Sequence, residues 1–363
     1  MESLKTTLLI DEHKHLKARL APFGGWLMPI QYQGILAEHR CCRESSALFD
    51  TCHMGQFLFW GEIGSAGIEQ LFSFRLDTIA VGRCRYGFLL NERGGIVDDL
   101  TVYRLAADHL MVVVNAGPEQ KDFAAIQTAL GSGSSFIDQT GRSGKLDLQG
   151  PRSRDVLRHH FGAEIEKIPF FGFRPMTILG TDAIVSRTGY TGELGYEIYC
   201  RNEVVVDLWR LLLRDERVVP AGLGARDLLR LEMGYSLYGS DLDETTTPLE
   251  AGLERFVDFN REFVGRDALL RQRNEGLRRT RVAFRVASRR SPRRGYEILH
   301  GDIRVGTVTS GAFSPMLGCG IGMGYVAPEA AAVGTSLQVV HEGVALEGTV
   351  VELPFYREGS LKT

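Results

Sequence analysis

The chain has 363 residues, 44% hydrophobic and 24% charged, with a formal net charge of -3 at pH 7. These values are typical of a globular protein of two or three domains, and no apolar run reaches the roughly 18 residues of a membrane-spanning helix. A small negative net charge gives no general attraction to nucleic acid. The N-terminal stretch MESLKTTLLIDEHKHLK lacks the pattern of a secretion signal, so we expect a cytoplasmic protein with no membrane or nucleic-acid partner.

Six cysteines are spread along the chain, and none belongs to a C-x-x-C pair. The adjacent Cys41 and Cys42 suit neither a disulfide bridge nor a zinc site. We therefore expect reduced structural thiols and no bound metal.

Helix and strand patterns are mixed up to residue 279. Helices are predicted at 117–130, 150–161, 202–214 and 222–234. Pro118 and Pro151 suit the first turn of a helix, and Asn202 is expected to cap the third helix. Strands are predicted at 98–105 and 109–117, close enough for a hairpin, and at 145–150, 183–189 and 195–200. After residue 279, short strands separated by glycine-rich turns predict a compact β-barrel or sandwich, so the expected fold class is α+β.

The segment GGIVDDLTVY at 94–103 places two acids at the start of a predicted strand. Because side chains alternate along a strand, Asp98 and Asp99 cannot both enter one pocket. Asp98 shares its face with the apolar residues of the strand, so we expect it to accept hydrogen bonds from the preceding glycine turn. Asp99 shares its face with Thr101 and Tyr103, which suit the lining of a ligand cleft. Asp99 is therefore the candidate for chemistry, with a turn or cap contact as the alternative.

The segment SRTGYTGELGYE at 186–197 carries three glycines at three-residue spacing. A strand follows it, so it does not match a dinucleotide-binding turn, and the glycines are expected to let backbone approach a flat ligand or to turn a hairpin. Glu197 lies on the strand face opposite Tyr196 and Ile198, so its carboxylate needs a partner or solvent. Two parallel N–H bonds to it would suit the amidine-like edge of a pterin; a surface glutamate is the alternative.

The segment at 222–234 predicts a helix whose first turn holds Arg226 and Asp227. An aspartate suits the positive end of the helix dipole, whereas an arginine does not. Arg226 is therefore expected to bind a carboxylate or an anion elsewhere. Downstream, Asp241, Asp243 and Glu244 are expected in a solvated loop rather than in a metal site.

A basic segment follows at 271–294, where ten arginines accompany a single acid, Glu275. Val282, Phe284 and Val286 share one face of a predicted strand, with Arg281 and Arg285 interleaved between them. The simplest interpretation is a solvated strand face with a linker. A docking surface for an acidic protein or an anionic ligand tail is the second, because clustered positive charge steers such partners.

Four motifs occur together: HMG at 53–55, GGIVDDLTVY at 94–103, SRTGYTGELGYE at 186–197 and GLGARDLLRLEMGYSLYG at 222–239. Their order resembles the folate-dependent aminomethyltransferases, the T-protein family of the glycine cleavage system. The opening HLKARLAPFGGWLMPIQY, the middle VVVNAG and the late GTVTSGAFSPMLGCGIGMGYV are similar to that family as well. Each motif alone is weak, but the ordered set is specific and covers the whole chain.

The resemblance implies a three-lobed cloverleaf around a central tetrahydrofolate site, with two ferredoxin-like α+β lobes and a β-barrel. The lobes would comprise 1–53 with 140–232, 54–139 with 233–278, and 279–363. The implied reaction takes the aminomethyl group from the lipoyl arm of H-protein, releases ammonia and leaves the one-carbon unit on tetrahydrofolate, with no metal. We expect H-protein to be the partner, with the basic segment 271–294 as a candidate contact.

The resemblance also implies roles for individual side chains. Asp99 would be the catalytic carboxylate near folate N10, and it would orient the folate amine and stabilise developing positive charge, or relay a proton. The other implied residues surround the cofactor: Glu197, Tyr190 and Asn115 would hold the pterin, Arg226 would complete the polar network, and Tyr86, Thr101 and Tyr103 would line the walls.

Three details depart from the family pattern. Cys52 stands where serine is usual, Thr101 replaces an apolar residue, and the pair Cys41 and Cys42 is unusual. These departures concern the substrate more than folate binding. The alternatives are therefore a tetrahydrofolate-dependent demethylase of a small methyl donor and a folate-binding protein without transfer activity.

Overall fold

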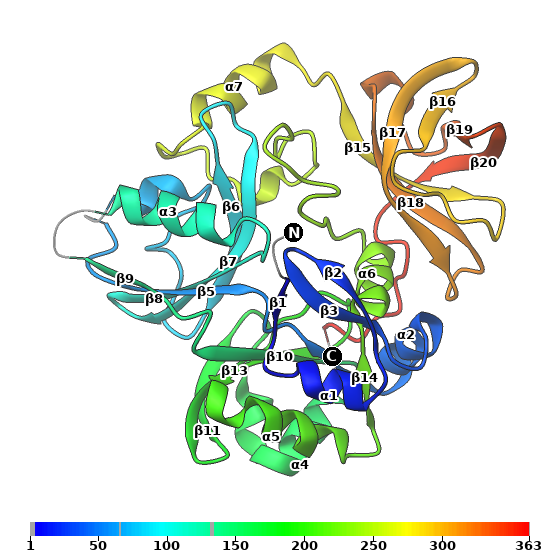
Figure 1. The fold of residues 1–363 in the computed structure, drawn as a ribbon. Helices are drawn as coiled ribbons and strands as arrows, with labels where there is room; N and C mark the ends of the chain where they lie inside the picture. The colour runs from blue at the N-terminus through cyan, green and yellow to red at the C-terminus, as the bar shows by residue number, and fades with distance from the viewer. Residues whose placement is uncertain (1–3, 65–66, 131–133, 363) are drawn as a thin grey trace.

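A computed structural model describes residues 4–64, 67–130 and 134–362 of the chain. It is a mixed α+β fold that ends in a six-stranded antiparallel β-barrel. Besides the barrel, the fold contains a five-stranded sheet and a six-stranded sheet. Figure 1 shows the two sheets and the barrel as three bodies, with helix α6 (Leu223–Glu232) between the six-stranded sheet and the barrel. No helix in the described part of the chain is long and apolar enough to cross a membrane.

The six-stranded sheet forms from distant parts of the chain. Its strands lie in the order β11 (Phe173–Ile178), β12 (Thr181–Ser186), β13 (Gly195–Arg201), β10 (Ser143–Gln149), β4 (Ser46–Asp50) and β14 (Val218–Ala221). Helices α4 (Ser153–Phe161) and α5 (Asn202–Leu213) cover one face, where Leu48 of β4 joins their core. Its neighbours Ala47 and Phe49 pack on the other face against α2 (Ile35–Glu44) and α6. The side-chain alternation of β4 thus fixes two helical layers.

The five-stranded sheet has the order β6 (Cys84–Leu90), β7 (Ile96–Ala106), β8 (His109–Val114), β5 (Gly55–Trp60) and β9 (Ser135–Asp138). One face packs against α3 (Glu119–Ala129) and the short helix η1 (Ile68–Leu71) through residues such as Val102 and Ile126. On the other face, Tyr103 and Val113 contact Phe173 and Tyr199 of the six-stranded sheet. The two sheets therefore meet at the face that carries Asp99 and Tyr103.

The remaining elements surround these sheets. The N-terminal part forms α1 (Ile10–His15) and a small sheet in the order β1 (Lys5–Thr6), β3 (Trp26–Gln31), β2 (Arg19–Phe23). The barrel runs β15 (Thr280–Val286), β18 (Cys319–Val326), β17 (Ile303–Ser314), β16 (Glu297–His300), β19 (Ser336–His341), β20 (Val344–Val351). The other helices are α7 (Arg266–Glu275) and the short helices η2 (Ala163–Lys167), η3 (Glu254–Phe256) and η4 (Pro328–Ala330).

The predicted helices and strands up to residue 279 are all present, and the expected barrel after that residue is confirmed. One detail of the helix at 202–214 was wrong: Arg201 is the capping residue and Asn202 already lies in the helix. The Asn202 side chain donates instead to the carbonyl of Gly141. All six cysteines are free thiols, as expected.

Candidate functional site

Strand β7 separates its two acids as the alternation predicts. Asp98 is fully buried on the core face, and Asp99 is partly buried on the face that meets the six-stranded sheet. The expected partner of Asp98 was wrong, however. Asp98 accepts hydrogen bonds from the backbone N–H and side-chain Nδ2 of Asn115, at 3.0 and 2.8 Å, because β8 ends beside it, whereas the glycine turn is held by Asn91.

Asp99 lies between two donors from neighbouring strands. Tyr86 Oη on β6 donates to Asp99 Oδ2 at 2.8 Å, and Asn115 Nδ2 donates to Oδ1 at 2.9 Å. Burial and, to a smaller extent, the nearby charge of Asp241 raise the pKa of Asp99 to about 6, although the two hydrogen bonds favour the charged form. The carboxylate is therefore mostly ionised at neutral pH, and each oxygen keeps a free acceptor direction.

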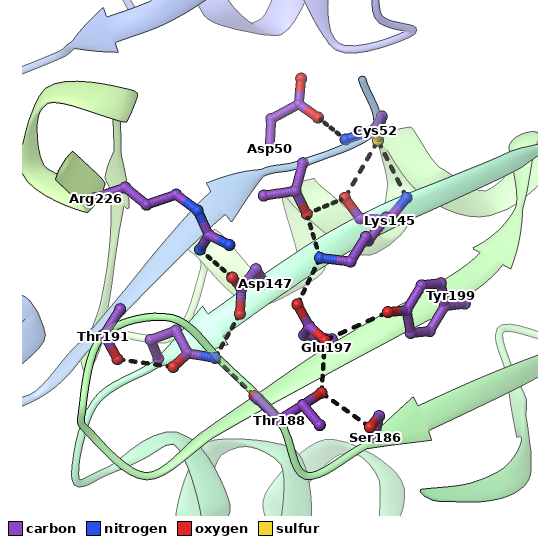
Figure 2. A network of polar contacts seen from close by, with 12 residues as sticks. Asp50, Cys52, Lys145, Asp147, Ser186, Thr188, Thr191, Glu197, Tyr199 and Arg226 are labelled. Carbon is purple, nitrogen blue, oxygen red and sulfur yellow. Dashed lines mark hydrogen bonds and ion pairs between the residues drawn. The ribbon is translucent and has the colours of Figure 1, made fainter. Parts of the chain in front are cut away.

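Glu197 belongs to a second cluster, on β13. Its Oε1 accepts from Lys145 Nζ of β10 at 2.6 Å, and its Oε2 accepts from Thr188 at 2.5 Å. Tyr103 of β7 also donates to Oε2, at 3.2 Å, which joins the two sheets. Burial raises the pKa of Glu197, but Lys145 and the hydrogen bonds outweigh this and lower it to about 2. Figure 2 shows Lys145 and Glu197 directed at one another above the sheet.

Arg226 pairs with a carboxylate from another element, as its place in α6 predicts. Its Nη1 contacts Asp147 Oδ2 of β10, and both side chains are buried or nearly so (Figure 2). The guanidinium also lies 5.3 Å from the centre of the Tyr190 ring. Tyr190 donates to the carbonyl of Ser236 and stacks on Tyr235, with ring centres 5.8 Å apart. An aromatic and cationic wall thus stands beside the Glu197 cluster.

The eight residues singled out in the sequence form linked groups. Asp99, Tyr86 and Asn115 are in direct contact, as are Tyr103 with Glu197 and Arg226 with Tyr190. Thr101 lies on the same face of β7, paired in register with Tyr86. Burial raises the pKa of Tyr190 above its ordinary value, and the charge of Asp99 adds to this effect.

Sequence reasoning missed the polar face of β10. Lys145, Asp147 and Gln149 are fully buried and alternate with Leu146 and Leu148, and this two-residue period could have revealed a second polar face at the site. Gln149 donates to Asp147 at 2.5 Å and accepts from Thr191 at 2.8 Å.

The glycines at 189 and 195 serve Gln149. A Cβ at either position would lie 2.1 or 2.2 Å from the Gln149 side chain, so only glycine fits there. These glycines therefore allow two segments of the protein to approach each other closely, rather than backbone and a flat ligand.

Asp241 was also misjudged, because it is buried and not in a solvated loop. Arg230 Nη1 of α6 contacts its Oδ2 at 2.6 Å, and Thr309 and Ser310 of β17 donate to it. Asp243 and Glu244 are both exposed. In the described ranges no group of His, Cys, Asp and Glu side chains is arranged to hold a metal ion.

Two surface cavities lie away from these groups. One of about 500 Å³ is lined by residues of the segment 254–260 and by Arg273, and one of about 540 Å³ by His159, His160 and residues 211 and 214–217. Neither is lined by Asp99 or Glu197. The candidate site is therefore defined by the converging polar and aromatic side chains where the two sheets meet.

Comparison with known proteins identifies the family. Residues 9–261 match the GCVT N-terminal domain, and residues 279–357 match the glycine cleavage T-protein C-terminal barrel domain. The chain is 41% identical over 356 residues to an aminomethyltransferase of Halothermothrix orenii, covering 97% of this chain and 100% of that protein. It is also 41% identical over 358 residues to one of Rubrobacter xylanophilus, covering 98% and 95%.

A solved structure agrees with these relatives. The crystal structure of glycine cleavage system aminomethyltransferase T from Bartonella henselae superposes with a TM-score of 0.93 at 35% identity, covering 98% of this chain and 99% of that one. The chain therefore belongs to the aminomethyltransferase family, the T-proteins of the glycine cleavage system.

Proposed function

We propose that this aminomethyltransferase moves the one-carbon unit of the aminomethyl group from the lipoyl arm of H-protein to tetrahydrofolate and releases ammonia. One observation carries the proposal: the Asp99 carboxylate is held by Tyr86 and Asn115 at the face where the two sheets meet. The same face gathers Tyr103, Glu197 and further aromatic groups, which is the composition expected for a flat polar ligand.

The side chains present fit tetrahydrofolate. A pterin is flat and carries N–H donors, so it needs aromatic faces and carboxylate acceptors. The Tyr190 ring provides a face, and Glu197 Oε1 receives only Lys145 among the described contacts, so it keeps acceptor capacity. When bound, tetrahydrofolate supplies the amines that accept the one-carbon unit. We assign Asn115, Tyr190, Glu197 and Arg226 to the pterin and its polar surroundings, with Tyr86, Thr101 and Tyr103 as wall residues.

Asp99 acts by position and charge in this proposal. Its free acceptor directions allow it to orient an amine N–H of the substrate. Its negative charge, in a partly buried site, stabilises the positive charge that develops on the transferred carbon. Because its pKa is about 6, the same group is also suited to hold a proton at an Asp99 oxygen for a short time near neutral pH.

We propose the cloverleaf division for the fold, with lobes at 1–53 plus 140–232, 54–139 plus 233–278, and 279–363. It is supported by the sheets: the six-stranded sheet uses strands between 46 and 50 and between 143 and 221, and the five-stranded sheet uses strands between 55 and 138. The folate site would lie where these two sheets meet, on the side of α6. We propose H-protein as the partner, with part of the basic segment as its contact.

The decisive experiment compares the wild type with Asp99→Asn in an assay that contains aminomethylated H-protein and tetrahydrofolate. The substitution keeps shape and removes charge, so folate affinity should stay within about tenfold while turnover falls by about 10²- to 10⁴-fold. The wild-type rate should also fall as the pH drops through about 6, because Asp99 then gains a proton.

The products separate the alternatives. Ammonia, methylenetetrahydrofolate and dihydrolipoyl H-protein support the proposal. Methyltetrahydrofolate formed from a small methyl donor without H-protein would instead indicate a demethylase, and folate binding without any turnover would indicate a binding protein. Full turnover by Asp99→Asn would remove Asp99 from the reaction.

A further inference from the structure

A third aspartate, Asp122, lies close to Asp98, and the proposed mechanism gives it no role. Asp122 is in the first turn of α3 and is fully buried. Among the described residues, no donor reaches either of its carboxyl oxygens. A buried carboxylate without donors is strongly disfavoured, so this group must hold a proton or find a partner that does.

The partner is Asp98. The two carboxyl groups form a hydrogen bond when one of them carries a proton. Asp98 already accepts two hydrogen bonds from Asn115, which favour its charged form, whereas Asp122 accepts none. The proton therefore belongs on Asp122, which donates it to Asp98.

The other charged groups around Asp122 do not change this assignment. Burial, the charge of Asp98 and, to a smaller extent, that of Asp99 raise the pKa of Asp122 to about 10. Lys121 lowers it, but its Nζ is exposed and bound to Glu244 at 2.6 Å. Tyr238 is neutral, because burial and the nearby charges of Asp98, Glu244 and Asp122 raise its pKa.

The pair is connected to Asp99 through one amide group. Asn115 Nδ2 donates to Asp98 Oδ1 at 2.8 Å and to Asp99 Oδ1 at 2.9 Å. The same nitrogen lies 2.9 Å from the Asp99 carbonyl oxygen. Because Asp98 binds both the backbone and the side chain of Asn115, the orientation of this amide depends on a fixed Asp98 carboxylate.

We propose that Asp122 is a positioning residue for Asp99: it donates its proton to Asp98, which orients the Asn115 amide that holds the Asp99 carboxylate. This inference rests on the proposed role of Asp99 in the transfer reaction. The arrangement allows a charged Asp98 to stay buried, and it leaves Asp99 as the carboxylate that faces substrate. Asp122 touches no substrate itself.

The first test observes the proton directly. Carbon-13 NMR of protein labelled at the aspartate carboxyl carbon, with the Asp122 signal assigned by its loss in Asp122→Asn, should show a protonated carboxyl between about pH 5 and about pH 8. An Asp122 signal in the ionised position at neutral pH would overturn the proposal. This measurement does not depend on turnover, so it stands even if Asp99→Asn keeps activity and the proposed function fails.

The second test is kinetic and uses two substitutions of similar size. Asp122→Asn keeps a neutral donor to Asp98, so kcat should stay within about threefold, and the acid limb of its pH profile should not move. Asp122→Leu removes the donor and should lower kcat by about 10²-fold with KM for tetrahydrofolate little changed. Asp182→Asn, at an exposed position, is the control.

The outcomes decide between positioning and structure. Wild-type kcat in a folded Asp122→Leu protein would overturn the proposal. A downward shift of the acid limb in Asp122→Asn would also overturn it, since it would mean that the wild-type residue is charged. If Asp122→Leu does not fold, Asp122→Asn and the NMR titration still decide the question.

Discussion

At the scale of single residues, three buried carboxyl groups share one cluster. Burial raises the pKa of all three above the ordinary value of 3.8, to about 6 for Asp99 and to about 10 for Asp122, which holds the proton of the Asp98–Asp122 pair. Such groups bind protons more readily in the folded chain than in the unfolded chain. Their burial therefore lowers stability as the pH rises above about 4, and the loss grows up to each folded pKa.

This gives a prediction for Asp122→Asn that concerns stability alone. The asparagine has no proton to lose, so the free energy of unfolding of the variant relative to the wild type should increase between about pH 4 and about pH 8. The slope should be at most about 1.4 kcal/mol for each pH unit. Urea unfolding across this pH range measures it. A flat difference would mean that the unfolded and folded chains bind the same number of protons at this position.

The residue-scale prediction of the site succeeded where strand geometry was sufficient. Alternation along β7 identified Asp99, and the helix dipole correctly indicated that Arg226 needs a carboxylate. The partners themselves could not be predicted. Asn115, which follows β8 and binds Asp98, and Asp147 of β10, which binds Arg226, come from other parts of the chain, and local sequence pattern carries no information on such pairings.

At the scale of elements, helix α6 packs against both the six-stranded sheet and the barrel. Ala225 and Leu229 pack on the six-stranded sheet, and Leu231 packs on the barrel. Arg230, also fully buried, contacts Asp241 at 2.6 Å and donates to Ser310 of β17 at 2.8 Å. These contacts join one helix to both bodies.

Removing one partner of the buried Arg230–Asp241 ion pair should strongly destabilise the folded chain. Arg230→Met leaves Asp241 charged and buried, so it should lower the free energy of unfolding by about 3–5 kcal/mol. The double variant Arg230→Met with Asp241→Leu should recover part of this loss, because no buried charge remains unpaired, although Thr309 and Ser310 lose their acceptor. The control Arg304→Met removes an exposed pair with Glu297 and should cost no more than about 1 kcal/mol. Urea unfolding of the three variants measures these losses of free energy. Equal losses in the single and the double variant would contradict the stabilising role of the Arg230–Asp241 ion pair.

Elements with clear end signals were predicted well, and others were not. The helix at 117–130 begins after Pro118 and follows a strand, so the sequence pattern was sufficient to predict it. Helix α2 was missed because its charged and polar residues Glu38, His39 and Arg43 are buried instead of facing solvent, and His39 and Arg43 bind Glu232 of α6. A polar pattern that is buried by tertiary contacts does not resemble an amphipathic helix.

At the scale of the whole molecule, the site depends on contacts between distant segments. Tyr103 and Glu197 are 94 positions apart, and they meet because the five- and six-stranded sheets pack face against face. The change of pattern near residue 279 predicted the barrel, since glycine-rich turns between short strands are a local signal. The meeting of the two sheets was expected only from the family resemblance of the ordered motifs.

The molecular surface leads to the last prediction. Within the basic segment, Arg281 is drawn into a contact with Ser236, whereas Arg289, Arg290, Arg293 and Arg294 are exposed on the loop between β15 and β16. These four lie close together on one exposed loop, so they can attract an acidic partner from solution. Reversing them to glutamate should raise the apparent KM for H-protein several-fold and reduce its dependence on salt, with kcat at saturation little changed.

A matched reversal separates a specific contact from net charge. The exposed arginines at 152, 158, 201 and 214 lie on the six-stranded sheet and its helices, and their reversal changes the net charge equally. If the basic loop is the docking surface, only the first set should weaken H-protein at low ionic strength. Because the Debye length falls from about 10 Å at 0.1 M salt to about 3 Å at 1 M, the difference between the two sets should disappear at high salt. An equal effect of both sets would assign the attraction to overall charge, and no effect of either would leave the basic loop as a solvated surface.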